Sequence, residues 1–167
     1  MSRTEVVFNL QVAMGLVFWG LAVAWFILPK LYKLSFSDAL LIPLLVAVLR
    51  SHGMNFLVSQ INNGLSENFA APAAFGDLAV CLLALLAAVT IKLQLKVGPI
   101  LAWLYAVLGT VDFAIGFALG NAHDMPNHLG PTWFMVIYEA PLEIMALFVL
   151  FRLLLKHPGR KAVPAAA

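Results

Sequence analysis

Six ionisable side chains interrupt segments of the chain that are otherwise apolar. Arg50 and His52 occur together in the sequence VLRSHGMNF, and four carboxylic acids follow in later apolar segments: Asp77, Asp112, Glu139 and Glu143. A charged side chain at the centre of a bilayer costs at least about 2.5–3.5 kcal/mol, so such residues normally face a partner or water. We therefore predict that these six residues meet in one intramembrane polar pocket.

The charge balance of the predicted pocket constrains its chemistry. A guanidinium group can bind carboxylates in a bidentate manner, so we expect Arg50 to pair with at least one of the four acids. Four carboxylates and one guanidinium cannot all be ionised in a dry site without a large cost in free energy. We expect a proton on one carboxyl group, a bound cation or a protonated His52 to complete the balance.

Some of these groups also have a purely structural interpretation. Asp77 is predicted near the start of its helix, where a carboxylate interacts favourably with the helix dipole. Arg50 and one carboxylate can form a pair that only holds the helices in register. Asp112 and Glu143 are predicted far from either end of their helices, which favours a functional role, and Glu143 is predicted to be the deepest of the acids.

A polar loop carries a second, weaker set of candidate ligands. His123, Asp124 and His128 offer groups that bind zinc or another divalent ion, but their spacing matches no metal-binding motif, so a solvated loop is favoured. The single cysteine, Cys81, lies in an apolar segment and is predicted to be a packing residue. The sequence predicts no cofactor.

The composition assigns these residues to a membrane protein. Of the 167 residues, 63% are hydrophobic and 11% are charged, whereas soluble domains carry roughly 25% charged residues. Five apolar segments are long enough to cross a hydrocarbon core of about 30 Å as helices, at residues 6–28, 39–59, 72–91, 99–120 and 132–155. We predict an all-α transmembrane bundle of five helices over residues 1–155, followed by a basic, disordered cytoplasmic tail at 156–167.

The positions of the basic residues predict the orientation of this bundle. With five helices, three groups fall on one side: Lys30 and Lys33, then Lys92 and Lys96, then Arg152, Lys156, Arg160 and Lys161. The other side carries only Arg3. Because Lys and Arg are enriched in cytoplasmic loops, the N-terminus is predicted outside and the C-terminus inside. The six ionisable residues then lie in the outer halves of their helices, so the pocket is predicted to open outward.

Two further patterns predict local packing. In the second predicted helix, Ser51, Asn55 and Ser59 recur every four residues, so an α-helix would place them on one face. In the fourth, Gly116 and Gly120 form a GxxxG pair, which is typical of closely packed helices.

The sequence FAAPAAFGDLA at residues 69–79 resembles a widespread group of small bacterial inner-membrane proteins of unknown function. The similarity includes RSHG at residues 50–53 and Asp112, and extends towards the last predicted helix. This resemblance implies a multi-pass protein of the bacterial cytoplasmic membrane. It implies no particular chemistry.

Three functions are compatible with these features. The pocket can bind or transport a small solute or protons, with Glu143 or Asp112 as the exchangeable site and Arg50 as its neighbour. The chain can instead be an accessory or assembly subunit of a larger membrane complex. An intramembrane enzyme acting on a lipid or isoprenoid is less favoured, because no HExxH, GxSxG or phosphate-binding glycine motif is present.

The expected partners follow from the same features. They are the lipid bilayer and either a second copy of the chain or a larger membrane complex. A transporter would require a homo-oligomer, since five helices contain no internal inverted repeat. Nucleic acid is excluded as a partner, because the basic residues are explained by membrane topology.

Overall fold

The computed structural model of this chain describes residues 2–157, and within this range every regular element is a helix. The elements are α1 (Arg3–Ala22), the π-helical η1 (Val23–Ile27), α2 (Leu28–Leu31), α3 (Phe36–Val46), the 3₁₀ helix η2 (Ala47–Leu57), α4 (Glu67–Lys92), α5 (Gly98–Ala122), the short 3₁₀ helix η3 (Met125–Asn127) and α6 (Thr132–Lys156). The predicted tail, from residue 158 onward, lies outside the described residues.

Five helical segments in the described part of the chain are long and apolar enough to cross a membrane: Arg3–Leu31, Phe36–Leu57, Glu67–Lys92, Gly98–Ala122 and Thr132–Lys156. The prediction of an all-α fold with five such helices is therefore confirmed. The largest difference in bounds concerns α4, which begins at Glu67 rather than at Pro72.

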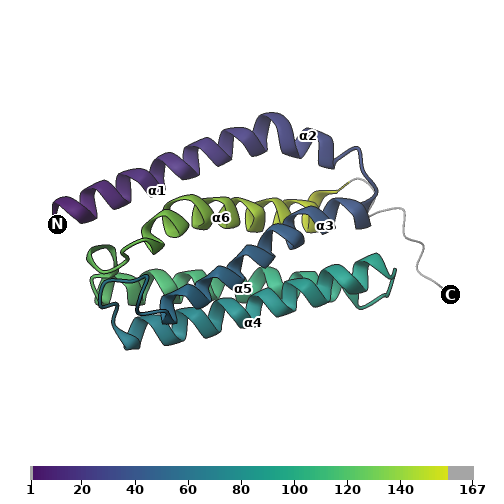
Figure 1. Ribbon diagram of the computed structural model, residues 1–167. Helices are drawn as coiled ribbons and strands as arrows, with labels where there is room; N and C mark the ends of the chain where they lie inside the picture. Colours follow the sequence, from purple (N-terminus) through teal and green to yellow (C-terminus); the bar gives the residue numbers. More distant parts are fainter. Residues whose placement is uncertain (1, 158–167) are drawn as a thin grey trace.

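The helices form a bundle in which α1 is peripheral. Figure 1 shows α1 and α2 along one edge, α6 beside them, and α4 and α5 side by side at the opposite edge. The segment α3–η2 crosses the bundle obliquely and packs on α4 and α6, whereas α1 packs mainly on α6. A four-helix core of α3–η2, α4, α5 and α6 therefore surrounds the centre of the molecule.

The segment α3–η2 changes its winding half-way, where a continuous α-helix over 39–59 was predicted. After Val46 the chain continues as a 3₁₀ helix to Leu57, an uncommon length for this conformation. With three residues per turn, every third side chain shares a face, and the buried residues of η2 follow this spacing: Ala47, Arg50, Gly53 and Phe56. The predicted common face of Ser51, Asn55 and Ser59 is therefore wrong.

Two separate clusters of buried apolar side chains fill the bundle. One lies towards the N-end, which we define as the end with Ser2 and the loops at 58–66 and 123–131, and it includes Phe69 and Leu129. The other lies towards the basic end, where Lys30, Lys92 and Lys156 are found, and it includes Leu44 and Leu150. The ionisable residues in the middle of the helices lie between these clusters.

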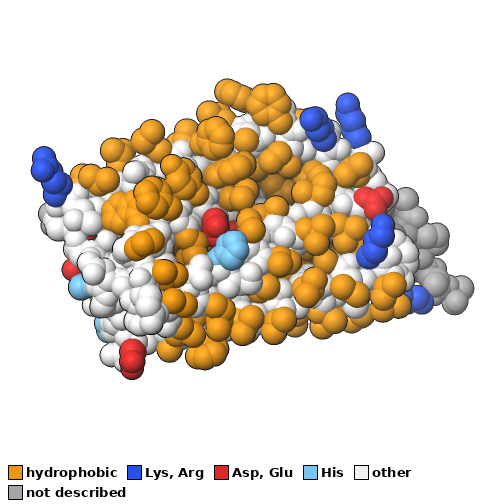
Figure 2. Space-filling model, viewed as in Figure 1, with side chains coloured by type: hydrophobic (Ala, Val, Ile, Leu, Met, Phe, Trp, Pro, Cys, Tyr) orange, Lys and Arg blue, Asp and Glu red, His pale blue; other side chains and the backbone are white. Residues whose placement is uncertain are grey.

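The surface of the bundle is apolar along its flanks and polar at its two ends. Large exposed apolar side chains occur on all five long segments, for example Phe18, Leu45, Leu82, Ile115 and Phe134. Figure 2 shows such side chains covering the visible flank, with the charged side chains mostly towards the two ends. One exception is visible in the middle of this flank, where a histidine and an acidic side chain lie next to each other.

A glycine allows α1 to approach α6. A Cβ atom on Gly15 would lie 2.9 Å from Pro141 Cγ, which is closer than real Cβ atoms come to other atoms. Nearer the N-end, Trp133 Nε1 donates a hydrogen bond of 2.8 Å to Gln11 Oε1, and the Trp133 ring packs edge-on against Phe8. These contacts fix α1 against one side of α6.

We predict that Gly15→Ala loosens α1, whereas Gly20→Ala does not. At Gly20 the nearest atom to a new Cβ is Met145 Sδ at 3.9 Å, which is ordinary contact, and alanine favours a helix by roughly 0.5–1 kcal/mol. At Gly15 overpacking against Pro141 should outweigh that gain and cost about 1–3 kcal/mol. Thermal unfolding in detergent checks this; equal midpoints for the two variants would contradict the packing described.

Candidate functional site

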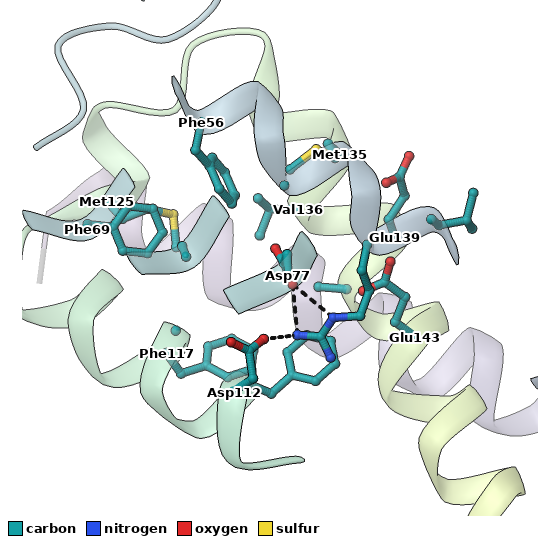
Figure 3. Close-up of a pocket in the computed structure, with 17 residues that line it drawn as sticks. Phe56, Phe69, Asp77, Asp112, Phe117, Met125, Met135, Val136, Glu139 and Glu143 are labelled. Atoms are coloured by element: carbon teal, nitrogen blue, oxygen red, sulfur yellow. Dashed lines mark hydrogen bonds and ion pairs between the residues drawn. The ribbon is translucent and has the colours of Figure 1, made fainter. Parts of the chain in front are cut away.

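Arg50 lies at the centre of the site, with its side chain only 1% exposed. Nε donates a hydrogen bond of 2.9 Å to Asp77 Oδ1, and Nη2 lies 2.8 Å from the same oxygen. Nη2 also donates to Asp112 Oδ2 (Figure 3). Nη1 donates to the carbonyl oxygen of Gly109 at 3.3 Å. The guanidinium carbon lies 4.1 Å from the centroid of the Phe113 ring, a cation–π contact. All three guanidinium nitrogens are therefore engaged.

Three glycines lie where η2, α4 and α5 approach one another, and two of them, Gly53 and Gly76, leave no room for a Cβ atom. Each of the three helices contributes one glycine, and each glycine lies against a charged side chain from another of the three helices. The contacts are Gly109 of α5 with Arg50, Gly76 of α4 with Asp112, and Gly53 of η2 with Asp77. A Cβ atom at Gly53 or Gly76 would overlap the carboxylate that it faces. The two aspartates can therefore reach Arg50 only because the helices are closely packed at these glycines.

The 3₁₀ winding of η2 matches its side chains to those of α6. Three residues of a 3₁₀ helix rise about 6 Å, and so do four residues of an α-helix. His52 and Asn55, three residues apart, accordingly contact Glu139 and Met135, which are four residues apart. His52 Nδ1 lies 2.9 Å from Glu139 Oε2, and Asn55 Nδ2 lies 3.9 Å from Met135 Sδ.

A cavity of about 90 Å³ adjoins the charge cluster, which is room for several water molecules (Figure 3). Its walls come from four of the long segments and from η3, and α1 contributes none of them. The lining residues are Leu49, Arg50, Gly53, Phe56, Phe69, Ala73, Asp77, Asp112, Phe113, Gly116, Phe117, Met125, Met135, Val136, Glu139, Ala140 and Glu143.

Gly116 widens this cavity. No atom lies within 4 Å of the position that its Cβ would occupy, so the predicted close packing through this glycine is wrong. Gly120 does lie in a packed environment, where a Cβ would be 3.1 Å from Met125 Cε. The glycine of α5 that lies against Arg50 is Gly109, one helical turn before Asp112, where a Cβ atom would be in ordinary contact at 3.4 Å.

Five of the six ionisable residues predicted to share a pocket line this cavity, namely Arg50, Asp77, Asp112, Glu139 and Glu143. His52 lies outside the lining and contacts the cavity only through Glu139. Asp77 lies almost three turns inside α4, so its interpretation as a carboxylate at the start of a helix is wrong. Its carboxylate instead binds Arg50.

Glu143 differs from the other acids. It is 6% exposed, it lines the cavity, and it forms no hydrogen bond or ion pair with any of residues 2–157. Figure 3 shows it beside Glu139, on the side of the cavity opposite Asp112. Because Arg50 binds the two aspartates and Glu139 lies against His52, Glu143 is the cavity acid without a cationic side chain in contact among residues 2–157. A buried carboxylate without a partner is costly, so the cavity favours a positive occupant or a proton.

A second buried polar group lies near this cluster. The Tyr105 hydroxyl has no hydrogen-bond partner among the described residues, and the tyrosine is 1% exposed. Its ring packs at Gly109, where Arg50 Nη1 also lies. Tyr105 therefore adds a buried polar side chain next to the charge cluster, outside the lining of the cavity.

The loop candidates for a metal site are not brought together. His128 Nδ1 lies 3.0 Å from the carbonyl oxygen of Asn63, and Asp124 accepts a hydrogen bond of 2.7 Å from Asn127. Within residues 2–157, no three His, Cys, Asp or Glu side chains are arranged to hold a metal ion.

Sequence reasoning missed Phe113 and the roles of Gly53 and Gly76. A signal was present in the spacing, because each charged residue of the cluster has a glycine one or three positions away on its own helix. The patterns are Arg50-x-x-Gly53, Gly76-Asp77 and Gly109-x-x-Asp112. In apolar helices, small residues mark close approach, and their proximity to charges indicates where the charges meet.

We predict that Arg50→Ala destabilises the bundle by about 3 kcal/mol, the lower end of the range for buried pairs, because the partly buried carboxylates of Asp77 and Asp112 lose their cation. Arg50→Lys should restore only part of this loss. An ammonium is a compact charge and cannot reach Asp77, Asp112 and Gly109 with the fork geometry of a guanidinium. Thermal unfolding of both variants in detergent measures the effect. Equal stability of wild type and Arg50→Ala would show that the cluster does not hold the fold.

We also predict opposite effects of alanine at two glycines. Gly76→Ala should cost about 1–3 kcal/mol, because its Cβ overlaps the Asp112 carboxylate, whereas Gly116→Ala meets open space and should be neutral or stabilising. The double variant Gly76→Ala/Asp112→Ala tests the cause. If the clash is the reason, the two substitutions are strongly non-additive when their unfolding free energies are compared.

Comparisons with known proteins identify the family of this chain. A family model described as "Domain of unknown function (DUF8737)" matches residues 7–155. Neither the curated proteins nor the solved structures with which the chain was compared contain a match. The family match agrees with the resemblance to a group of unknown function and, because it covers most of the sequence, the chain belongs to the DUF8737 family.

Proposed function

We propose that this chain is a multi-pass protein of the bacterial cytoplasmic membrane, with its N-terminus outside and its C-terminus inside. Its five long apolar segments and its apolar flanks support insertion, since a flank of this kind is solvated by lipid rather than by water. The basic residues at the end opposite the N-terminus support the orientation. In this setting the cavity and its acids lie at membrane depth.

We further propose that the cavity binds a small cationic solute, a proton being the smallest possible occupant. The observation that carries this proposal is Glu143: a carboxyl group in the middle of α6, buried at the cavity wall, without a partner among the described residues. A natural core avoids such a group unless the group acts on something that enters the cavity.

The proposed site divides the acidic residues into two roles. Asp77 and Asp112 are held by Arg50 and form the scaffold, because each gives an oxygen to the guanidinium. Glu143 is free to bind the solute. The apolar cluster towards the basic end, which includes Leu44 and Leu150, separates the site from that end of the bundle. The described conformation therefore supports binding, and transport would require a rearrangement of these helices.

We predict that Glu143→Gln abolishes cation binding while keeping the fold. Tetramethylammonium and hexyltrimethylammonium are suitable probes, because their charge does not depend on pH. If a probe at 100 times its Kd stabilises the wild type by about 2.7 kcal/mol, thermal unfolding in detergent should show a clear rise in Tm. The Glu143→Gln variant should show no rise, and without the probe it should be at least as stable as the wild type, because it lacks the unpaired acid.

Glu67→Gln is the matched control, since Glu67 is exposed at the first residue of α4. It should respond to the probes as the wild type does. If Glu143→Gln unfolds and neither ammonium probe shifts the wild type, the cluster serves the fold alone. In that case the proposal of an accessory subunit is favoured instead.

A further inference from the structure

Both ends of the cavity are closed by buried apolar side chains. Towards the N-end the wall is built from Phe56, Phe69 and Met125, which are 7%, 3% and 5% exposed, and the two phenylalanine rings pack edge-on at 5.3 Å. Leu129, in the same apolar cluster, is fully buried. Towards the basic end lies the larger apolar cluster with Leu150. An ion that keeps its hydration shell therefore meets no polar entrance at either end.

The flank of the bundle is different. Glu139 lines the cavity and its side chain is 29% exposed, and its partner His52 is 48% exposed. The surrounding flank is apolar, and in Figure 2 a histidine and an acidic side chain lie side by side in the middle of it. A polar pair at a lipid-facing position is costly, so its presence indicates a use. Through Glu139, this pair connects the lining of the cavity with the surface of the flank.

The walls of the cavity indicate the chemical class of ligand. Phe56, Phe69 and Phe117 provide aromatic faces, and Met125 and Met135 provide flexible thioethers. Such walls suit an apolar body, whereas a metal ion needs several oxygen or nitrogen ligands at one point. The unpartnered carboxyl group of Glu143 suits one positive charge. A ligand that fits both features has an apolar body and one positive charge, as a lipophilic ammonium ion does.

We propose that the ligand is a lipophilic organic ammonium that enters sideways from the membrane, past the His52–Glu139 pair, and places its charge at Glu143. This inference rests on the proposed cation-binding function and adds the ligand class and the route. Glu139 lies one helical turn from Glu143 on α6, so it offers the cation a first carboxylate at the surface before the second one inside.

Blocking the route at a single residue tests this proposal. The background is Cys81→Ala, because Cys81 is the single cysteine of the chain and is buried. His52→Cys is labelled with a bulky maleimide, and Leu82→Cys, at an exposed position on α4, is labelled in the same way as the control. Association of hexyltrimethylammonium is followed by stopped-flow tryptophan fluorescence in lipid nanodiscs. The label at His52→Cys should slow association at least tenfold, and the label at Leu82→Cys should leave it unchanged.

The outcomes separate this proposal from the proposed function. Unmodified protein should bind hexyltrimethylammonium at least tenfold more tightly than tetramethylammonium, because the second probe has no apolar chain. If both probes bind equally well and the His52→Cys label has no effect on the rate, cation binding stands and lateral entry is wrong. The route is also wrong if a label at Phe117→Cys, on the α5 side of the cavity, slows association and the one at His52→Cys does not. If neither probe binds the unmodified protein, both proposals fail.

Discussion

The ion pairs of Arg50 with Asp77 and Asp112 are the constraint on which the rest of the structure depends. A guanidinium buried to this degree must have acceptors for its N–H groups, and it obtains them from two different helices and from the backbone at Gly109. The carboxylates of Asp77 and Asp112 fit around it only because Gly53 and Gly76 have no Cβ atom at the points of contact. These two glycines therefore follow from the charge cluster, and the cluster in turn fixes the register of η2, α4 and α5.

The 3₁₀ winding of η2 is a second consequence of this constraint. This conformation is less favourable than an α-helix over eleven residues, because its hydrogen bonds have poorer geometry. It places Arg50, Gly53 and Phe56 in one straight row that faces α4 and the cavity. The same winding turns His52 and Asn55 towards α6. The contacts of Arg50, Gly53 and Phe56 with α4 and of His52 and Asn55 with α6 offset the local cost of the 3₁₀ winding. An α-helix would align only one of these two rows with its partner helix.

The cavity has two parts: in the first the charged side chains are paired, and in the second an acidic side chain has no contact partner among the described residues. Arg50, Asp77 and Asp112 satisfy one another and behave as scaffold, whereas Glu143 is buried and has no contact partner in the described part of the chain. This contrast within one set of acids separates the residues that hold the fold from the residue that we propose as the cation-binding group. The exposed pair of His52 and Glu139 links the second part to the surface of the bundle.

The sequence by itself determined the five apolar helices and the residues that interrupt them, because hydropathy over about twenty residues and the cost of burying a charge depend on residue type alone. It did not determine which charges pair, since pairing depends on contacts between segments far apart in the chain. Only the tertiary structure decided that Arg50 binds both aspartates, that Glu143 has no contact partner within residues 2–157, and that the second long segment continues as a 3₁₀ helix after Val46. The open space at Gly116 and the start of α4 at Glu67 also depend on neighbouring helices. In each case the deciding quantity is the fit between side chains on different helices, and local residue types do not specify it.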